Sequence, residues 1–270
     1  MIRIFIFSLA ASFALFTQGV LAQKLQGRAV YRSAVQVSFS APEGSKMSDM
    51  DKAAMQAQLA QALTKDYELV FNNQESTYTK MESLEASSTA KSGGFAMVIG
   101  DGGQDQLYKN TETRTYKKAE GLLGKAFLIE DELTLPEWTL VEEYKEIVGQ
   151  KCQKAQLTKI REITDFNDMS KTKMDTVYIT AWFATEIPVA QGPKSYWGLP
   201  GLILEVSTGN ASITCTELEL NPSEEIVIEV PKKGRKVTQE EYDQISDEKI
   251  KELTQGYKGK GGKITIQTGG

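Results

Sequence analysis

The sequence predicts a β-rich α+β protein in which most of the chain forms one antiparallel sheet. Short segments that alternate apolar and polar residues recur between residues 31 and 220, separated by Gly, Pro or Asn. This period of two is typical of strands with one buried face. Helical spacing occurs in two segments, near residues 48–65 and 238–254. Because turns rather than helices join the successive strands, we expect antiparallel pairing.

The first 22 residues have the order of parts of a secretory signal peptide. Arg3 provides a positive charge, residues 4–16 are apolar and uncharged, and Val20-Leu21-Ala22 offers small residues at the −3 and −1 positions. The apolar run is shorter than the roughly 20 residues that span a bilayer, which argues against the alternative of an uncleaved anchor. No cysteine lies near the cut, so a bacterial lipid anchor is not expected. We therefore predict cleavage after Ala22 and a soluble, periplasmic or secreted protein.

Charge and composition exclude several classes of function. Loss of the signal peptide removes one basic residue and leaves 30 Lys+Arg against 36 Asp+Glu, a net charge of −6, with no clustered basic footprint for nucleic acid. No second apolar segment is long enough to cross a membrane. The absence of histidine rules out catalytic triads and removes the commonest transition-metal ligand. Neither a cofactor nor a metal is expected.

Cys152 and Cys215 are the only cysteines. An even pair in an exported chain usually forms a structural disulfide, so we expect these two residues to be bridged. Two free thiols are the alternative.

The N-terminal half is expected to hold a strand, a helix and a hairpin. Alternation over residues 31–39 predicts a long strand, and Ser48 followed by Asp51 resembles a capping box that opens a helix to about residue 65, with Met55 on its apolar stripe. Two strands, 67–71 and 77–80, flank the turn pair Asn72-Asn73. Residues 85–94 are expected to be a mobile loop, and strands resume at 95–99.

The C-terminal half is expected to be a meander followed by a helix. The strand candidates are 125–130, 138–144 and 152–157, then 175–185 after a hairpin loop at 165–173. Thr238 and Glu241 resemble a capping box for the last helix. No linker is evident, so residues 23–255 are expected to form one domain, and the Gly/Lys-rich residues 256–270 a disordered tail.

The run Gly198-Leu199-Pro200-Gly201-Leu202-Ile203-Leu204-Glu205 is the most unusual segment. Residues 199–202 fit a type II turn, because Pro200 presets φ and Gly201 tolerates a positive φ at the next position. In the strand that follows, Leu202 and Leu204 are expected on one face and Glu205 on the other. The simplest interpretation is a tight turn that enters a core strand.

This run and its surroundings resemble the GLPGLI family of exported proteins of Gram-negative bacteria. Residues 181–188, Gly192-Pro193, and the aromatic pair Tyr196 and Trp197 are similar to the segments that precede the motif in that family. Lys194 and Ser195 place the aromatic pair later than the family pattern does. The resemblance implies a curved antiparallel sheet, half-barrel or bowl-like, with helices packed on one side and a concave surface. It provides no catalytic residue and no established reaction.

Three functions are compatible with these features. The first is a non-catalytic binding or interaction protein of the cell envelope, whose aromatic surface meets a protein or a glycan. The second is a periplasmic carrier of a lipid or lipoprotein in a lined cavity. The third is a hydrolase that uses Glu186 and Glu205 as paired carboxylates. We favour the first. The residues assigned to a binding site are Trp182, Glu186, Tyr196, Trp197, Leu199, Pro200, Gly201 and Glu205.

Overall fold

The computed structural model describes residues 25–36, 48–82, 106–165, 168–209 and 211–257. Within these residues the strands form one open, curved sheet of twelve, in the order β12-β6-β5-β4-β3-β2-β1-β11-β10-β9-β8-β7. Every pairing is antiparallel except that of β12 with β6. The predicted fold class, a β-rich α+β protein with a curved antiparallel sheet, is confirmed.

The strands of the first half are β1 (Gln26–Val35), β2 (Lys65–Asn72), β3 (Glu75–Lys80), β4 (Gln106–Asn110), β5 (Thr115–Leu122) and β6 (Lys125–Glu132). Those of the second half are β7 (Thr139–Ile147), β8 (Gln150–Asp165), β9 (Asp168–Ala184), β10 (Leu202–Thr208), β11 (Ala211–Leu220) and β12 (Arg235–Val237). The helices are α1 (Asp49–Leu63) and α2 (Gln239–Tyr257).

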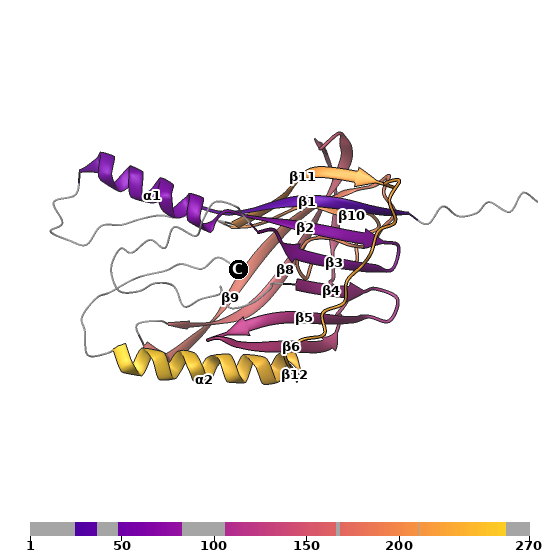
Figure 1. Cartoon of the computed structure of the whole chain (residues 1–270). Coiled ribbons are helices and arrows are strands. Elements are labelled where there is room, and N and C mark those ends of the chain that lie inside the picture. Colours follow the sequence, from indigo (N-terminus) through magenta and orange to yellow (C-terminus); the bar gives the residue numbers. More distant parts are fainter. Residues whose placement is uncertain (1–24, 37–47, 83–105, 166–167, 210, 258–270) are drawn as a thin grey trace, which may run out of the picture.

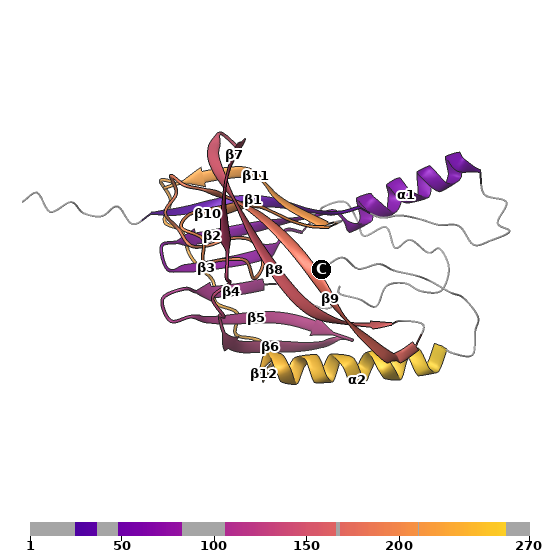
Figure 2. The same ribbon diagram turned by 180° about the vertical axis from the view of Figure 1, so that it is seen from behind.

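The sheet curls so strongly that its two ends face each other. In both views the long strands β8 and β9 run diagonally across the layer made by β1 to β6 (Figures 1 and 2). A core cluster that includes Tyr31 and Phe71 from the first layer and Cys152 and Leu202 from the second fills the space between them. The curl is therefore held by burial of apolar surface on the inner face.

A second cluster lies on β8, β9 and β10, on the face of β8 and β9 opposite to Cys152 and Ala184. It includes Leu157, Phe183, Leu199 and Ile203, with Trp138 packed at its border. Leu199 and Ile203 come from the unusual segment identified in the sequence. That segment is thus mainly core.

The two helices differ in how they meet the sheet. α2 lies along β6, where Tyr242 packs edge-on against Phe127 with the ring centroids 5.4 Å apart (Figure 1). α1 instead extends past the end of the sheet, and none of its described side chains is buried (Figure 1). The expectation that helices pack on one side is correct for α2 only, because the apolar stripe of α1 is too weak to define a buried face.

Both predicted helix starts are confirmed. Ser48 and Asp51 form a reciprocal capping box at α1, and the hydroxyl of Thr238 accepts from the amide of Glu241 at 3.2 Å at the start of α2. Such caps satisfy amides that have no partner within the helix.

The predicted hairpin is confirmed as β2 and β3. The Asn72 side chain accepts hydrogen bonds from the amides of Gln74 and Glu75, at 2.9 and 2.8 Å, and so closes the turn.

The prediction of a hairpin loop at residues 165–173 is wrong. β8 and β9 stay paired as far as Asp165 and Asp168, so most of the polar segment is strand. Cross-strand pairing outweighs the weak β propensity of these residues.

The expected disulfide is not formed, since Cys152 and Cys215 are both buried free thiols. Cys152 is on β8 and Cys215 on β11, and two strands lie between them in the sheet. Each sulfur instead donates to a backbone carbonyl, Cys152 to Gln150 at 3.4 Å and Cys215 to Glu217 at 3.2 Å. An even cysteine count does not ensure that the two strands are neighbours.

Several expectations lie outside the described residues. They are the signal peptide, the loop at 85–94, the strand at 95–99, the end of the first strand and the tail beyond Tyr257. Among the described helices, none is both long and apolar enough to span a membrane.

Candidate ligand-binding site

The segment before the unusual run is fixed by one buried lysine. Lys109 on β4 is fully buried, and its Nζ donates to the backbone carbonyls of Gly192, Lys194 and Tyr196 at 2.6, 2.9 and 3.1 Å. Burial lowers the pKa of Lys109 to about 7. These three bonds satisfy the donors of an ammonium group and fasten residues 192–196 to the first layer.

Two further buried side chains make the same connection. The Tyr31 hydroxyl donates to the Ile203 carbonyl at 2.7 Å, and the Ser76 hydroxyl donates to Oε1 of Gln191 at 2.7 Å. The Gln191 amide in turn donates to the Gln74 carbonyl at 3.1 Å. The segment 191–203 is therefore held against β1, β3 and β4 by a polar network inside the core.

The predicted type II turn at residues 199–202 is wrong. Gly201 does not have a positive φ, and the Leu202 amide donates to the Ile187 carbonyl at 3.0 Å. The left-handed residue is Gly198, with φ of 86°. Gly201 is needed for another reason, because a Cβ there would lie 2.1 Å from the Ala184 carbonyl oxygen.

Two tryptophans lock the loop between β6 and β7 onto this segment. Nε1 of Trp138 donates to the Trp197 carbonyl at 2.9 Å, and Nε1 of Trp197 donates to the Thr134 carbonyl at 3.2 Å. Trp197 itself is buried. Its indole therefore forms a wall rather than an exposed surface.

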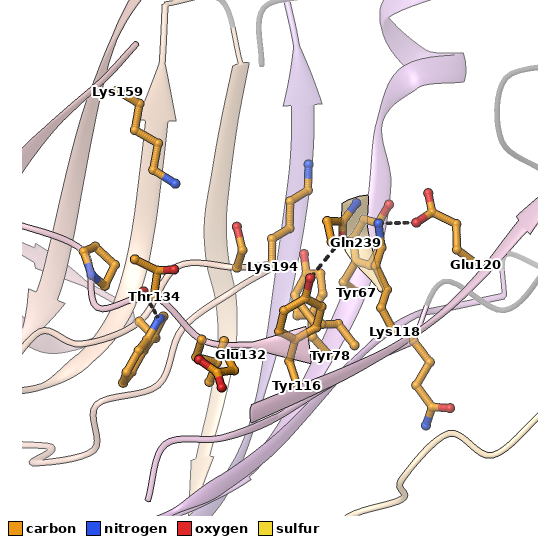
Figure 3. A pocket seen from close by; sticks show the side chains of 16 residues that line it. Tyr67, Tyr78, Tyr116, Lys118, Glu120, Glu132, Thr134, Lys159, Lys194 and Gln239 are labelled. Atoms are coloured by element: carbon orange, nitrogen blue, oxygen red, sulfur yellow. Dashed lines mark hydrogen bonds and ion pairs between the residues drawn. The ribbon is translucent and has the colours of Figure 1, made fainter. Parts of the chain in front are cut away.

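Between these walls and the first layer lies a cavity of about 550 Å³, here called the inner pocket (Figure 3). Strands β2 to β5 line it from one side, and β8, the loop after β6 and the segment 194–197 from the other. The lining residues are Tyr67, Tyr78, Gln106, Leu107, Tyr116, Lys118, Glu120, Glu132, Leu133, Thr134, Pro136, Lys159, Lys194, Ser195, Trp197 and Gln239. β4 and β8 are far apart in the strand order, so the curl of the sheet creates the pocket.

Tyrosines form the floor of the inner pocket. The rings of Tyr67 and Tyr78 are stacked 4.8 Å apart, and Tyr31 meets Tyr78 edge-on at 6.1 Å. Tyr78 is only 3% exposed, yet its hydroxyl has no hydrogen-bond partner among the described residues. Burial raises the pKa of Tyr78, so the phenol stays protonated and remains a donor.

The remaining polar lining carries charges of both signs. Lys118 is ion-paired with Glu120, and the Tyr116 hydroxyl donates to Oε1 of Gln239 at 3.0 Å. Lys159 extends from its strand toward the side where Lys194 lies (Figure 3). The pocket therefore offers donors and acceptors around an aromatic floor.

The predicted site residues do not all lie in one place. Of the eight, only Trp197 lines the inner pocket. Tyr196, Leu199 and Gly201 belong to the packed segment behind its wall, and Glu186 and Pro200 are exposed.

Trp182 and Glu205 share the other face of β9 and β10 from Phe183. Trp182 pairs with Glu205 across the two strands and packs against the first cluster, while its neighbour Phe183 belongs to the second. Glu205 is ion-paired with Lys145 at 2.7 Å, and that ammonium group lies 4.5 Å from the centre of the Trp182 ring. Trp182 thus packs against the same cluster as Tyr196, whereas Trp197 lines the pocket.

The residues missed from the sequence are Tyr67, Tyr78 and Tyr116. Tyr67 and Tyr78 come from neighbouring strands that the sequence did predict, on the face that also carries Leu69. Counting the tyrosines that alternate on the same face as Leu69 could have indicated the aromatic lining of the pocket. Among the described residues, no group of three or more Cys, Asp or Glu side chains is placed to hold a metal ion.

Comparisons with known proteins give little functional information. The family model described as a protein of unknown function (Porph_ging) matches residues 138–205, the part that contains the unusual run, and covers about a quarter of the chain. No curated protein matches the sequence.

Two solved structures are similar, those of PNGF-II in the C2 and P21 space groups, both at 10% identity and covering 82% of this chain. The TM-scores are 0.47 and 0.46. The chain spans about a third of the length of the PNGF-II chains, 32% and 33%.

Proposed function

We propose that this chain is an exported, non-catalytic binding protein of the cell envelope that holds a small ligand in its inner pocket. The observation that carries the proposal is the inner pocket itself, a cavity of about 550 Å³ whose lining combines aromatic rings with charged and polar side chains. The cavity also has the size of small-molecule sites, roughly 300–1,000 Å³.

The lining favours a polar ligand over the acyl chain of a lipid carrier. Five of the lining residues are charged, namely Lys118, Glu120, Glu132, Lys159 and Lys194. An acyl chain would remove water from these groups without replacing their hydrogen bonds, which is unfavourable. The hydrolase hypothesis gains no support either, because Glu205 is ion-paired with Lys145 and neither Glu186 nor Glu205 lines the inner pocket.

Export is proposed from the sequence. The charged start, the apolar run and the small residues before Gln23 support it. An intact mass of protein from the periplasm or the medium that begins at Gln23 would support export, and a mass that begins at Met1 would contradict it.

Obstruction of the inner pocket tests the binding proposal. Ser195→Trp places an indole at an exposed lining position, and Ser223→Trp makes the same change at an exposed position outside the pocket. Native mass spectrometry of the three proteins, incubated with one library of small polar compounds, should show bound species for the wild type and Ser223→Trp but not for Ser195→Trp. Equal binding by all three proteins, or binding by none, would overturn the proposal.

A further inference from the structure

The two ends of the curved sheet differ in what covers them. At one end, β12 pairs with β6 over residues 127–129 and α2 lies along the same strand (Figure 1). At the other end, β7 pairs with β8 alone among the described strands, and neither helix lies against it (Figure 2). Proteins usually cover or shorten such an edge, because its amides and carbonyls bind other strands. β7 is therefore the open edge of this sheet.

The backbone of β7 is available on the side away from β8. Among the described residues, no backbone hydrogen bond joins residues 139–147 to any segment other than β8. The register shift between Val141 and Tyr144 interrupts the edge once, and residues 144–147 continue in regular pairing. A strand added here would gain several backbone hydrogen bonds, each worth about 1 kcal/mol.

Two large apolar side chains are exposed on one face of this edge. Leu140 is 52% exposed and Tyr144 is 53% exposed. They pair with Ala155 and Gln153 of β8, which are two positions apart, so both side chains lie on the same face. An edge that only avoids contact carries charge rather than apolar surface. Alternate side chains of a strand added beside β7 would cover both residues.

The same edge is acidic. Three exposed carboxylates lie along it without an ion pair among the described residues, namely Glu137, Glu142 and Glu146. The basic groups close to them are engaged, since Lys145 is ion-paired with Glu205 and Lys151 lies 4.8 Å from the centre of the Tyr144 ring. A second copy of this edge would bring like charges together, which disfavours a dimer through β7. A basic strand would pair with these carboxylates instead.

We infer that β7 is a docking edge for an extended, basic segment of a partner protein, in which Lys or Arg alternates with apolar residues. The segment adds to the sheet beside β7, its apolar side chains cover Leu140 and Tyr144, and its long basic side chains reach the carboxylates of the edge. This is recognition by β-strand addition. No residue of β7 lines the inner pocket, so the inference does not depend on the proposed function.

Three peptides of about eight residues, long enough for one strand, test this recognition. The first alternates Lys with Val or Ile, and the second has Glu in place of each Lys. The third is the first with Pro at two apolar positions, which removes two backbone donors and disfavours a strand. In calorimetry on the whole protein, the first peptide should bind at least about tenfold more tightly than the other two.

Hydrogen exchange locates the contact. Binding of the first peptide should slow amide exchange within residues 139–147, because the added strand shields and bonds the free side of β7. Exchange in residues 235–237 should not change, since β12 lies at the opposite end of the sheet.

Charge reversal links the binding to this edge. Glu142→Lys combined with Glu146→Lys should weaken binding of the first peptide at least about tenfold. Asp247→Lys combined with Glu248→Lys makes a matched change at two exposed carboxylates of α2, which lies along β6, and should have no effect.

The apolar contact is tested separately. Leu140→Asn should weaken binding of the first peptide by roughly fivefold, because it removes apolar surface that the peptide covers. Leu123→Asn makes the same change at a residue that is 40% exposed in the turn between β5 and β6, and should leave binding unchanged.

The outcomes separate this docking edge from the inner pocket. Equal binding of the three peptides, unchanged exchange in residues 139–147, or full binding by the Glu142 and Glu146 variant would overturn the inference. Slow exchange in residues 139–147 of a dimer without peptide would also overturn it, since a second copy would then be the occupant. Ser195→Trp should bind the first peptide as the wild type does, and a loss of binding in that variant would assign the peptide to the pocket instead.

Discussion

Tyr31 and Tyr78 lie edge to face in the core, with ring centroids 6.1 Å apart, yet only the Tyr31 hydroxyl has a hydrogen-bond partner. Tyr31 donates to the Ile203 carbonyl and so ties β1 to β10, whereas the Tyr78 hydroxyl is buried without a partner among the described residues. Two buried phenols in one cluster thus have different roles. One stabilises the fold through a hydrogen bond, and the other leaves its donor unsatisfied.

The two tyrosines should respond differently to the same substitution. Tyr31→Phe leaves the Ile203 carbonyl without its donor and should lower the free energy of unfolding by about 1–3 kcal/mol. Tyr78→Phe removes an unsatisfied hydroxyl and should leave the free energy unchanged or raise it by up to about 1 kcal/mol. Urea denaturation of the three proteins measures both. A loss in Tyr78→Phe as large as that in Tyr31→Phe would contradict the assignment.

Lys109 should make stability depend on pH. Burial lowers its pKa to about 7, whereas the unfolded chain keeps the proton up to about pH 10.5. Between pH 7 and 9 the unfolded state therefore binds more protons, and the free energy of unfolding should rise by up to about 1.4 kcal/mol per pH unit from this group. Urea denaturation at several pH values, compared with Lys109→Met, isolates this contribution.

The Lys109→Met variant provides the control. It should lack that part of the slope and, with the carbonyls of Gly192, Lys194 and Tyr196 left without a donor, be less stable at pH 7 by roughly 3 kcal/mol. Above pH 9 the cysteines and tyrosines lose protons in the unfolded state and also change the free energy of unfolding with pH. The comparison of wild type with variant is therefore made below pH 9. Parallel pH curves for wild type and variant would argue against a lowered pKa.

Gly201 should not tolerate any side chain. A Cβ at this position would lie 2.1 Å from the Ala184 carbonyl oxygen and 2.9 Å from its carbon, both backbone atoms of the paired strand β9. Gly201→Ala should therefore cost about 3 kcal/mol or prevent folding. Thermal unfolding followed by circular dichroism measures the loss.

The neighbouring residue is a matched control. Pro200 is exposed, so Pro200→Ala should change the free energy of unfolding by less than about 1 kcal/mol. If Gly201→Ala unfolds at the wild-type temperature, the close approach of Gly201 to the Ala184 carbonyl is incorrect.

The two cysteines should remain reduced and react slowly in the folded protein. Burial raises the pKa of Cys152 to about 11 and that of Cys215 to about 12, so at pH 8 only about one thiol in a thousand or fewer is the reactive thiolate. Iodoacetamide should modify neither residue within the time that labels both in urea. Intact mass without reductant checks the same point, since a mass lighter by two protons would show a disulfide.

Local features of the chain were predictable because they depend on near neighbours. The caps at Ser48 and Thr238 and the turn at Asn72-Asn73 are set by residues two or three positions apart. The strands of the meander follow from alternation. The loop at 165–173 was missed because the pairing of β8 with β9, and not the composition of the segment, decides its structure.

The candidate site was not predictable in the same way. The unusual run drew attention to residues 182–205, but β9 alternates, so Trp182 and Phe183 pack against different clusters on its two faces. The pocket instead uses tyrosines from β2, β3 and β5, which no motif marks. Only Trp197 belongs both to the predicted site residues and to the lining of the inner pocket.

The sequence alone determined the class of fold, the two helices and most strands, and it indicated the segment that closes the pocket. The tertiary structure alone decided that Lys109 holds this segment, that the cysteines are not bridged and that Tyr78 and Lys159 line the same cavity. The first and last of these relations link residues 80 or more positions apart through the curl of a twelve-stranded sheet. Such a curl results from burial summed over the whole inner face, so no local pattern encodes which distant side chains it brings together.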